Sequence, residues 1–199
     1  MRVVVITPPE PLFSSAELQQ LFPASGGDGG LIDFLARAAQ AEIEPPESWV
    51  GRSLGKQTLE LVLDSFPCGA ILLPYGPVRS LISVTYIDTA GAPQTVLPTD
   101  YAVPGDALRP IAGWPSSVRG PVRVRYEAGH DATDPQLLPA KHAIALMVQA
   151  GRPMMKDDPT VKRVRVDGVD ETEWAVSPQV LVMMREAATT ILRRYRGVR

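Results

Sequence analysis

The fold is decided by residues 57–63, Gln-Thr-Leu-Glu-Leu-Val-Leu, in which a leucine stands at every second position from 59 to 63. Successive side chains of a strand point to opposite faces, so this alternation predicts a β-strand with one buried face. Residues 122–126 repeat the pattern, because Val122, Val124 and Tyr126 are separated by arginines. We therefore predict a sheet in the middle of the chain.

Shorter runs between these two segments extend the predicted sheet. Residues 71–73, 78–88, 94–97 and 101–103 are rich in Val, Ile, Leu, Thr and Tyr, and a turn at 89–92 joins the second run to the third. The 199 residues include 20 prolines and 16 glycines, which are spread between these runs. Prolines and glycines in such places end short elements, so we expect a loop-rich fold.

Helices are predicted before and after the sheet. Ser14 and Glu17 have the spacing of a capping box and start a helix that ends at Pro23. A second helix over residues 31–45 has an apolar stripe that we expect to pack in the core. Asp134 followed by Pro135 starts a third helix, which Gly151-Arg152-Pro153 should end. The stripe of the second helix comprises Leu31, Phe34, Leu35, Ala38 and Ala41, and that of the third Leu137, Ala140, Ile144, Met147 and Val148.

This order of elements predicts an α+β fold, with a helical core and a small antiparallel sheet in a core domain over residues 1–152. Residues 153–199 form a second region. Its first part reads as a hairpin around Asp167-Gly168, a pair suited to a type I′ turn. A lone hairpin is barely stable in water, so we expect it to lie on another subunit. The predicted subunit interface comprises Arg163, Arg165, Asp170, Glu171 and Trp174.

A helix starting at Ser177-Pro178 ends the chain and is expected to project from the core. Residues 178–199 hold five arginines and one acid, a local net charge of +4, whereas residues 1–55 hold three basic and seven acidic residues, a net of -4. Arginines near a helix C-terminus offset its dipole, which explains one or two of them. We interpret the others as a docking surface, since Tyr and Arg dominate interface hot spots. The predicted docking residues are Ile191, Leu192, Arg193, Arg194, Tyr195, Arg196 and Arg199.

No arrangement of residues predicts catalysis, a metal or a cofactor. His130 and His142 lack metal-ligand spacing, Cys68 has no partner cysteine, and the glycine-rich residues 26–30 lack the Lys of a phosphate-binding loop. The formal net charge of -2 argues against general nucleic-acid binding. No apolar run is long enough for a membrane span. We predict a protein that is not an enzyme and is made in the cytoplasm.

Several stretches, taken in order, resemble a family of head-tail connector (adaptor) proteins of long-tailed phages, prophages and gene transfer agents. Together they cover residues 5–150. The first helix departs from the family pattern, because it lacks a basic Lys-x-x-Leu-Arg sequence. The stretches are Ile6-Thr7-Pro8-Pro9, residues 57–67, residues 73–86, Asp100-Tyr101, Trp114-Pro115 and residues 122–129.

The resemblance implies a ring, usually of twelve copies, that lies beneath the portal in the neck of a virion or phage-like particle. DNA passes through the ring without sequence-specific binding, and the partners are the portal protein and a stopper or tail-side neck protein. It also implies that the C-terminal segment faces the portal, so removing residues 190–199 should abolish portal association. Alternatives are another neck protein, such as a stopper or tail terminator, and a small ligand-binding enzyme.

Overall fold

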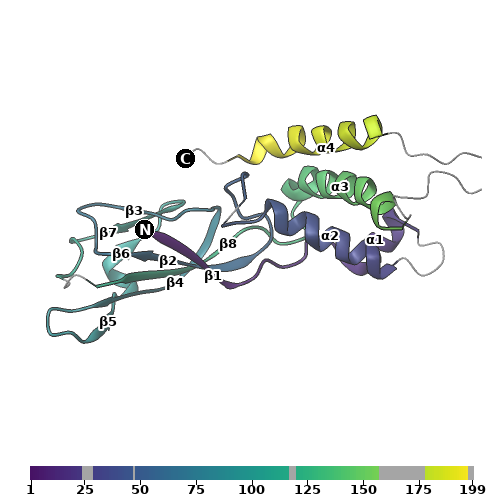
Figure 1. Ribbon diagram of the computed structural model, residues 1–199. Helices are drawn as coiled ribbons and strands as arrows, with labels where there is room; N and C mark the ends of the chain where they lie inside the picture. The colour runs from purple at the N-terminus through teal and green to yellow at the C-terminus, as the bar shows by residue number, and fades with distance from the viewer. Residues whose placement is uncertain (24–28, 47, 117–119, 157–177, 197–199) are drawn as a thin grey trace, which may run out of the picture. The chain divides into compact units, whose positions relative to one another are not determined.

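The computed structural model describes residues 1–23, 29–46, 48–116, 120–156 and 178–196 (Figure 1). It divides into two compact units. The sheet unit comprises Met1–Leu12, Ile43–Leu137 and the chain end from Tyr195, and the helical unit comprises Phe13–Glu42 and Leu138–Arg194. Helices and antiparallel sheets are both present, so the predicted α+β class is confirmed. The predicted domain boundary at residue 152 stays a prediction, and the hairpin lies outside the described residues.

The sheet unit contains two sheets in which all strand pairs are antiparallel. One has the strand order β1-β2-β8-β4-β5 and the other the order β3-β7-β6. The strands are β1 (Arg2–Thr7), β2 (Gln57–Leu63), β3 (Ile71–Leu72), β4 (Val78–Ile87), β5 (Pro93–Thr95), β6 (Tyr101–Ala102), β7 (Ala107–Pro110) and β8 (Val122–Ala128), with a 3-10 turn, η1 (Pro98–Asp100), before β6.

The two segments with the clearest alternation, β2 and β8, pair along their whole length. Leu59 lies opposite Tyr126 and Leu61 opposite Val124, and all four side chains are fully buried. Residues of both sheets share this core, including Ile71 of β3 and Leu108 of β7. Burying apolar side chains is worth about 25 cal/mol per Å² removed from water, so this shared face is what holds the two sheets together.

The other face of the large sheet is polar, and a buried carboxylate organises it. Glu60 of β2 accepts hydrogen bonds from Arg123 at 2.7 Å and from Arg125 at 2.8 Å, both on β8. Burial opposes ionisation of Glu60, but the hydrogen bonds from the two arginines outweigh it and lower the pKa of the carboxyl. Glu60 therefore pairs with both arginines and offsets one of their two positive charges within the subunit.

Two strands were missed by the sequence analysis. No strand was predicted before residue 57, yet β1 pairs with β2 and forms one edge of the large sheet. β7 lies in a proline- and glycine-rich stretch whose residues carry no clear alternation. β1 pairs with the distant β2, and β7 pairs with the distant β3 as well as with the nearby β6. Patterns within one short segment do not reveal such pairing.

The helical unit contains α1 (Ser15–Leu21), α2 (Gly29–Ile43), α3 (Leu138–Lys156) and α4 (Pro178–Leu192), and short 3-10 turns precede α3 (η2, Pro135–Leu137) and follow α4 (η3, Arg193–Tyr195). The predicted capping box at α1 is confirmed. Ser14 Oγ accepts from the backbone N–H of Glu17 at 3.2 Å, and Glu17 accepts from the backbone N–H of Ser14 at 2.8 Å. Lys141 of α3 also donates to Glu17 at 2.9 Å, which ties α1 to α3.

The Glu17 carboxylate should make stability depend on pH. The hydrogen bond from Lys141, followed by that from the Ser14 backbone, lowers the pKa of Glu17 to about 2. Because the folded-state pKa lies below the unfolded value, this stabilisation is complete above about pH 4.5 and is lost as pH falls toward 2. Glu17→Gln keeps a capping side chain, so it should cost only about 0.5–1 kcal/mol at pH 7. Urea unfolding should show this difference shrinking below pH 4.5; a difference that is constant with pH would contradict the assignment.

The third and fourth helices differ from the prediction in extent and placement. α3 continues through Gly151 and Pro153 to Lys156, although these residues were expected to end it. A proline removes only one N–H donor, and the Met and Lys residues that follow favour helix. α4 was expected to project, but it packs along α3 and buries Ala188 and Leu192 (Figure 1).

The apolar face of α2 was also assigned to the wrong side. Its buried residues are Ile32, Ala36, Ala39 and Ile43, whereas Phe34 is 57% exposed. Ala38 and Ala41, which were expected in the core, are exposed as well. α2 therefore carries apolar side chains on both its inner and its outer face.

Candidate functional site

The predicted docking residues at the chain end fall into two groups. Leu192 is 1% exposed and Ile191 is half-buried, so these two side chains pack inside the subunit. Arg193, Arg194 and Arg196 are exposed. The seventh residue, Arg199, lies outside the described residues. The surface that remains available to a partner is therefore the cluster of three arginines, which we call the arginine cluster.

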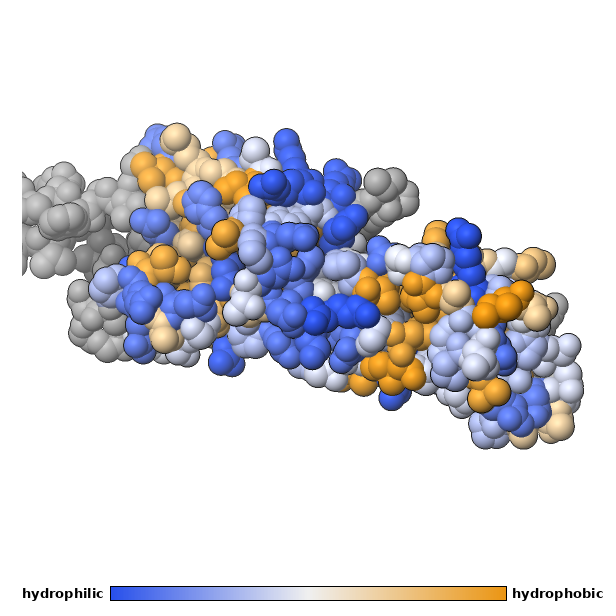
Figure 2. Space-filling model, turned by 180° about the vertical axis from the view of Figure 1, so that it is seen from behind, coloured by the Kyte–Doolittle hydropathy of each residue, from blue (hydrophilic) through white to orange (hydrophobic). Residues whose placement is uncertain are grey.

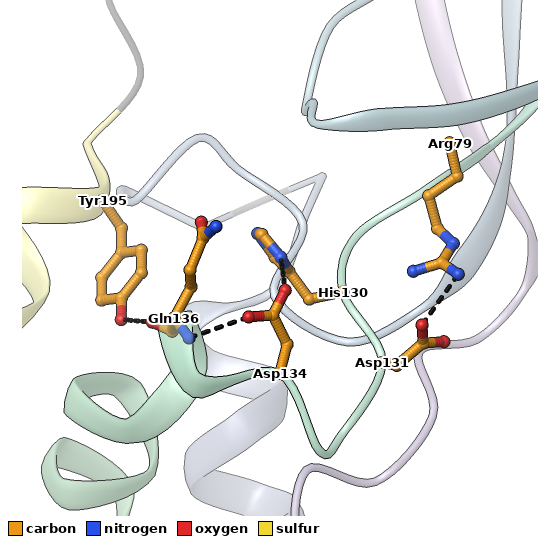
Figure 3. A network of polar contacts seen from close by, with 6 residues as sticks. All are labelled: Arg79, His130, Asp131, Asp134, Gln136 and Tyr195. Atoms are coloured by element: carbon orange, nitrogen blue, oxygen red, sulfur yellow. Dashed lines mark hydrogen bonds and ion pairs between the residues drawn. The ribbon is translucent and has the colours of Figure 1, made fainter.

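Tyr195 holds the chain end in place. Its hydroxyl donates a hydrogen bond to the backbone carbonyl of Gln136, in the turn η2 (Figure 3). The backbone N–H of Gln136 donates to Asp134 at 2.8 Å, and His130 Nδ1 lies 2.8 Å from the same carboxylate. The N–H of Gln136, and next the ring of His130, hold the pKa of Asp134 below its usual value. This network gives Tyr195 and the residues next to it a defined position.

An ion pair also orders the same loop. Arg79 of β4 donates to Asp131 at 2.9 Å, and both residues are partly exposed (Figure 3). His130 directly precedes Asp131 in the chain. The polar residues of this loop are thus explained by their contacts with one another, and their arrangement positions the chain end.

The predicted subunit-interface residues cannot be placed. Arg163, Arg165, Asp170, Glu171 and Trp174 all lie outside the described residues. Their assignment stays a prediction from the hairpin pattern and its charges.

Residues with possible chemical roles are dispersed. Cys68 is exposed, and His142 lies on the exposed side of α3. Among the described residues, no three His, Cys, Asp or Glu side chains come together as a metal site would require. In the same part of the chain, no helix is both long and apolar enough to cross a bilayer.

Large apolar side chains are exposed on both units, and Figure 2 shows hydrophobic areas on the face of each that it presents. On the sheet unit the most exposed, apart from the terminal Met1, are Leu72, Ile111 and Leu97, and on the helical unit Met183, Leu138 and Phe34. Scattered apolar residues are normal on a monomer, but contiguous apolar patches mark contacts with other proteins. The exposed apolar side chains on both units therefore favour a protein that contacts other proteins through more than one surface.

Comparison with known proteins gives a consistent picture. No protein-family model and no curated protein matches the sequence, but solved structures match the fold. A chain in the neck of an empty gene transfer agent (GTA) particle, computed with C6 symmetry, superposes with a TM-score of 0.71 at 17% identity, over 100% of this chain and 97% of that chain. This chain has the fold of a GTA neck protein.

Two further structures share this neck-protein fold. A chain in the virion of a native GTA particle gives a TM-score of 0.69 at 19% identity, and one in the neck of a native particle, computed with C12 symmetry, gives 0.61 at 17%. Each comparison again covers 100% of this chain and 97% of the other. The resemblance predicted from the sequence is therefore confirmed at the level of a neck-protein fold.

The sequence analysis missed the outward-facing apolar residues of α2. Their stripe was recognised, but it was assigned to the core. One signal was available: the buried residues Ile32, Ala36, Ala39 and Ile43 form a second stripe in the same 15-residue helix. A helix with apolar residues on two faces can bury one inside its own subunit, and the other is then free to contact a partner.

Proposed function

We propose that this protein is a head-tail connector (adaptor) of a phage-like particle. Copies of it form a ring, of twelve subunits, beneath the portal, join the capsid to the tail and let DNA pass through the lumen. The observation that carries this proposal is the fold similarity to chains in the necks of GTA particles, which extends over the whole chain. A similarity of this extent includes residues of both units and is not limited to one of them.

The net charge of the chain suits a protein through which DNA passes. Proteins that grip DNA neutralise many phosphates with Lys and Arg, whereas this chain has a formal net charge of -2. The two arginines on the polar sheet face are engaged by Glu60 at 2.7 and 2.8 Å. A ring of such subunits lets the duplex slide without strong attraction at any one point.

The arginine cluster is the proposed contact with the portal. Its three side chains are exposed, and the adjacent Tyr195 and Leu192 fix the backbone that carries them. A fixed backbone lowers the entropy lost on binding. Arginine binds carboxylates through two parallel hydrogen bonds, so an acidic groove on the portal is the complementary surface. Deleting residues 190–199 would also remove the buried Leu192, so substitution of the arginines is the cleaner test.

Replacing Arg193, Arg194 and Arg196 together by alanine should abolish co-purification of the portal protein and leave Tm unchanged. Loss of one interface arginine commonly costs 1–2 kcal/mol or more, so three should weaken binding by at least about a hundredfold. The measurement is capture of portal on the tagged protein, with thermal unfolding of each variant.

The matched control replaces Arg2 and Arg109, two exposed arginines of the sheet unit, and should retain portal. Undiminished capture by the triple variant would refute the docking assignment. A wild-type protein that captures tail-side neck proteins and not the portal would refute the adaptor role itself. It would favour a stopper, a role compatible with the C6 symmetry named for one of the matching necks.

A further inference from the structure

The outer face of α2 has the composition of a contact surface. Leu31, Phe34, Ala38 and Ala41 recur at i, i+3, i+7 and i+10, and we call them the α2 outer stripe. Phe34 is 57% exposed, Ala38 and Ala41 are exposed, and Leu31 is half-buried. The inner residues of α2 are already used within the subunit. The outer stripe is therefore open to a partner.

The outer face of α4 carries a stripe of the same length and spacing. Val180, Met183, Ala187 and Thr190 also recur at i, i+3, i+7 and i+10, and we call them the α4 outer stripe. All four side chains are exposed, Met183 to 66%. The opposite side of α4 buries Ala188 and Leu192. Both 15-residue helices are about 22 Å long, so each stripe can be covered along its length by the other.

The sizes of the side chains indicate how the two stripes fit. In each stripe the large residues are in the N-terminal half and the small residues in the C-terminal half. An antiparallel pairing places Phe34 opposite Ala187 and Met183 opposite Ala38. Large residues then meet small ones at each level, which is how apolar surfaces reach interior packing density.

Charged residues beside the two stripes also favour antiparallel packing of the helices. Arg37 and Glu186 are both exposed, and each precedes the third residue of its stripe. Arg37 and Glu186 therefore lie on the same side of their stripes. When two helices pack antiparallel, these corresponding sides face one another. In this register they are two residues apart along the axis, about 3 Å, so an ion pair forms across the contact. In a parallel pairing, Arg37 and Glu186 would lie on opposite sides of the contact and could not form this ion pair.

We propose that the α2 outer stripe of one subunit packs antiparallel against the α4 outer stripe of a second copy of this chain. The contact joins two different surfaces, so repetition of it generates a closed ring when the rotation per subunit is right. It rests on the proposed function, since it supplies the contact between neighbours in the neck ring. Two helices packed in this way are expected to lie about 8–10 Å apart.

Cysteines placed across the proposed contact test it directly. In a Cys68→Ser background, which removes the exposed native thiol, Ala38→Cys and Met183→Cys are combined and treated with a short bis-maleimide. The contact brings unlike positions together, so the double variant should give a ladder of covalent multimers. Each single-cysteine variant should remain monomeric on a denaturing gel. Ala38→Cys with Gln149→Cys, an exposed residue of α3, is the matched control and should give no ladder.

Charge reversal supplies a second measurement. Arg37→Glu or Glu186→Arg alone should reduce the cross-linking yield about tenfold, and the two together should restore it. All positions are exposed, so Tm should be unchanged. The treatment is applied to assembled particles and to the concentrated protein. Particles that contain the protein but give no ladder would overturn the helix contact and leave the adaptor role standing. Particles that lack it would overturn that role, and a ladder in the concentrated protein would still support the contact.

Discussion

Replacing Gly129 by alanine should lower the free energy of unfolding by about 4 kcal/mol. Gly129 has φ +98°, which L side chains rarely adopt, and an added Cβ would lie 2.1 Å from the carbonyl oxygen of Gly55. Backbone strain of this kind costs about 1–3 kcal/mol and overpacking a similar amount. The backbone cannot withdraw easily, because the N–H of Gly129 donates to Pro77 at 3.0 Å and that of His130 to Leu54 at 2.9 Å.

The matched control is Gly91→Ala. Gly91 has φ +84°, but a Cβ there would meet no atom within 4 Å. It therefore isolates the conformational cost, about 1–2 kcal/mol. Urea unfolding followed by circular dichroism measures both variants, and the larger loss should lower Tm by about 10 °C. Equal losses at the two positions would show that the close approach to Gly55 does not constrain the fold.

Replacing Glu44 by glutamine should cost about 3 kcal/mol. The carboxylate is 4% exposed and accepts hydrogen bonds from the backbone N–H of Leu54 at 3.1 Å, that of Gly55 at 2.7 Å and the side chain of Gln57 at 3.2 Å. Glutamine offers one acceptor oxygen and places an NH2 group against donors. A buried donor left unsatisfied costs about 1–3 kcal/mol, and more where a charged acceptor is lost.

The control for this substitution is Glu42→Gln, an exposed residue in the last turn of α2, two positions before Glu44. Exposed substitutions of this kind stay within about 0.5 kcal/mol. Equilibrium unfolding in urea compares the two variants with the wild type at pH 7. Similar stability of all three proteins would mean that residues 54–57 do not need the carboxylate. Glu44 and Gly129 act on the same backbone at Gly55, so their effects should not be additive.

The elements that the sequence predicted best are those with a local cause. The alternation of β2 and β8 and the capping box of α1 each depend on residues within one element, and all three are confirmed. The ends of α3 were less predictable, because a proline and a glycine weaken a helix without always ending it. β1 was missed because its pairing partner lies far away in the chain, and β7 because its four residues show no alternation.

The candidate contact surfaces were only partly accessible to sequence reasoning. The arginines at the chain end were recognised from composition, and their exposure at Arg193, Arg194 and Arg196 agrees with a role at the surface. Leu192 was placed in the same group, but it is buried within the subunit. Spacing shows which residues share a helix face, and it does not show which of two apolar faces turns inward.

The sequence by itself determined the α+β class, the central strands and the first helix, because alternation and capping act over a few residues. Only the tertiary structure decided that α4 lies along α3, that Tyr195 binds the Gln136 carbonyl and that the stripe of Phe34 faces outward. The physical reason is that a side chain is buried only when a second surface packs against it. A helix with two apolar faces turns one of them inward only when distant segments have folded against it.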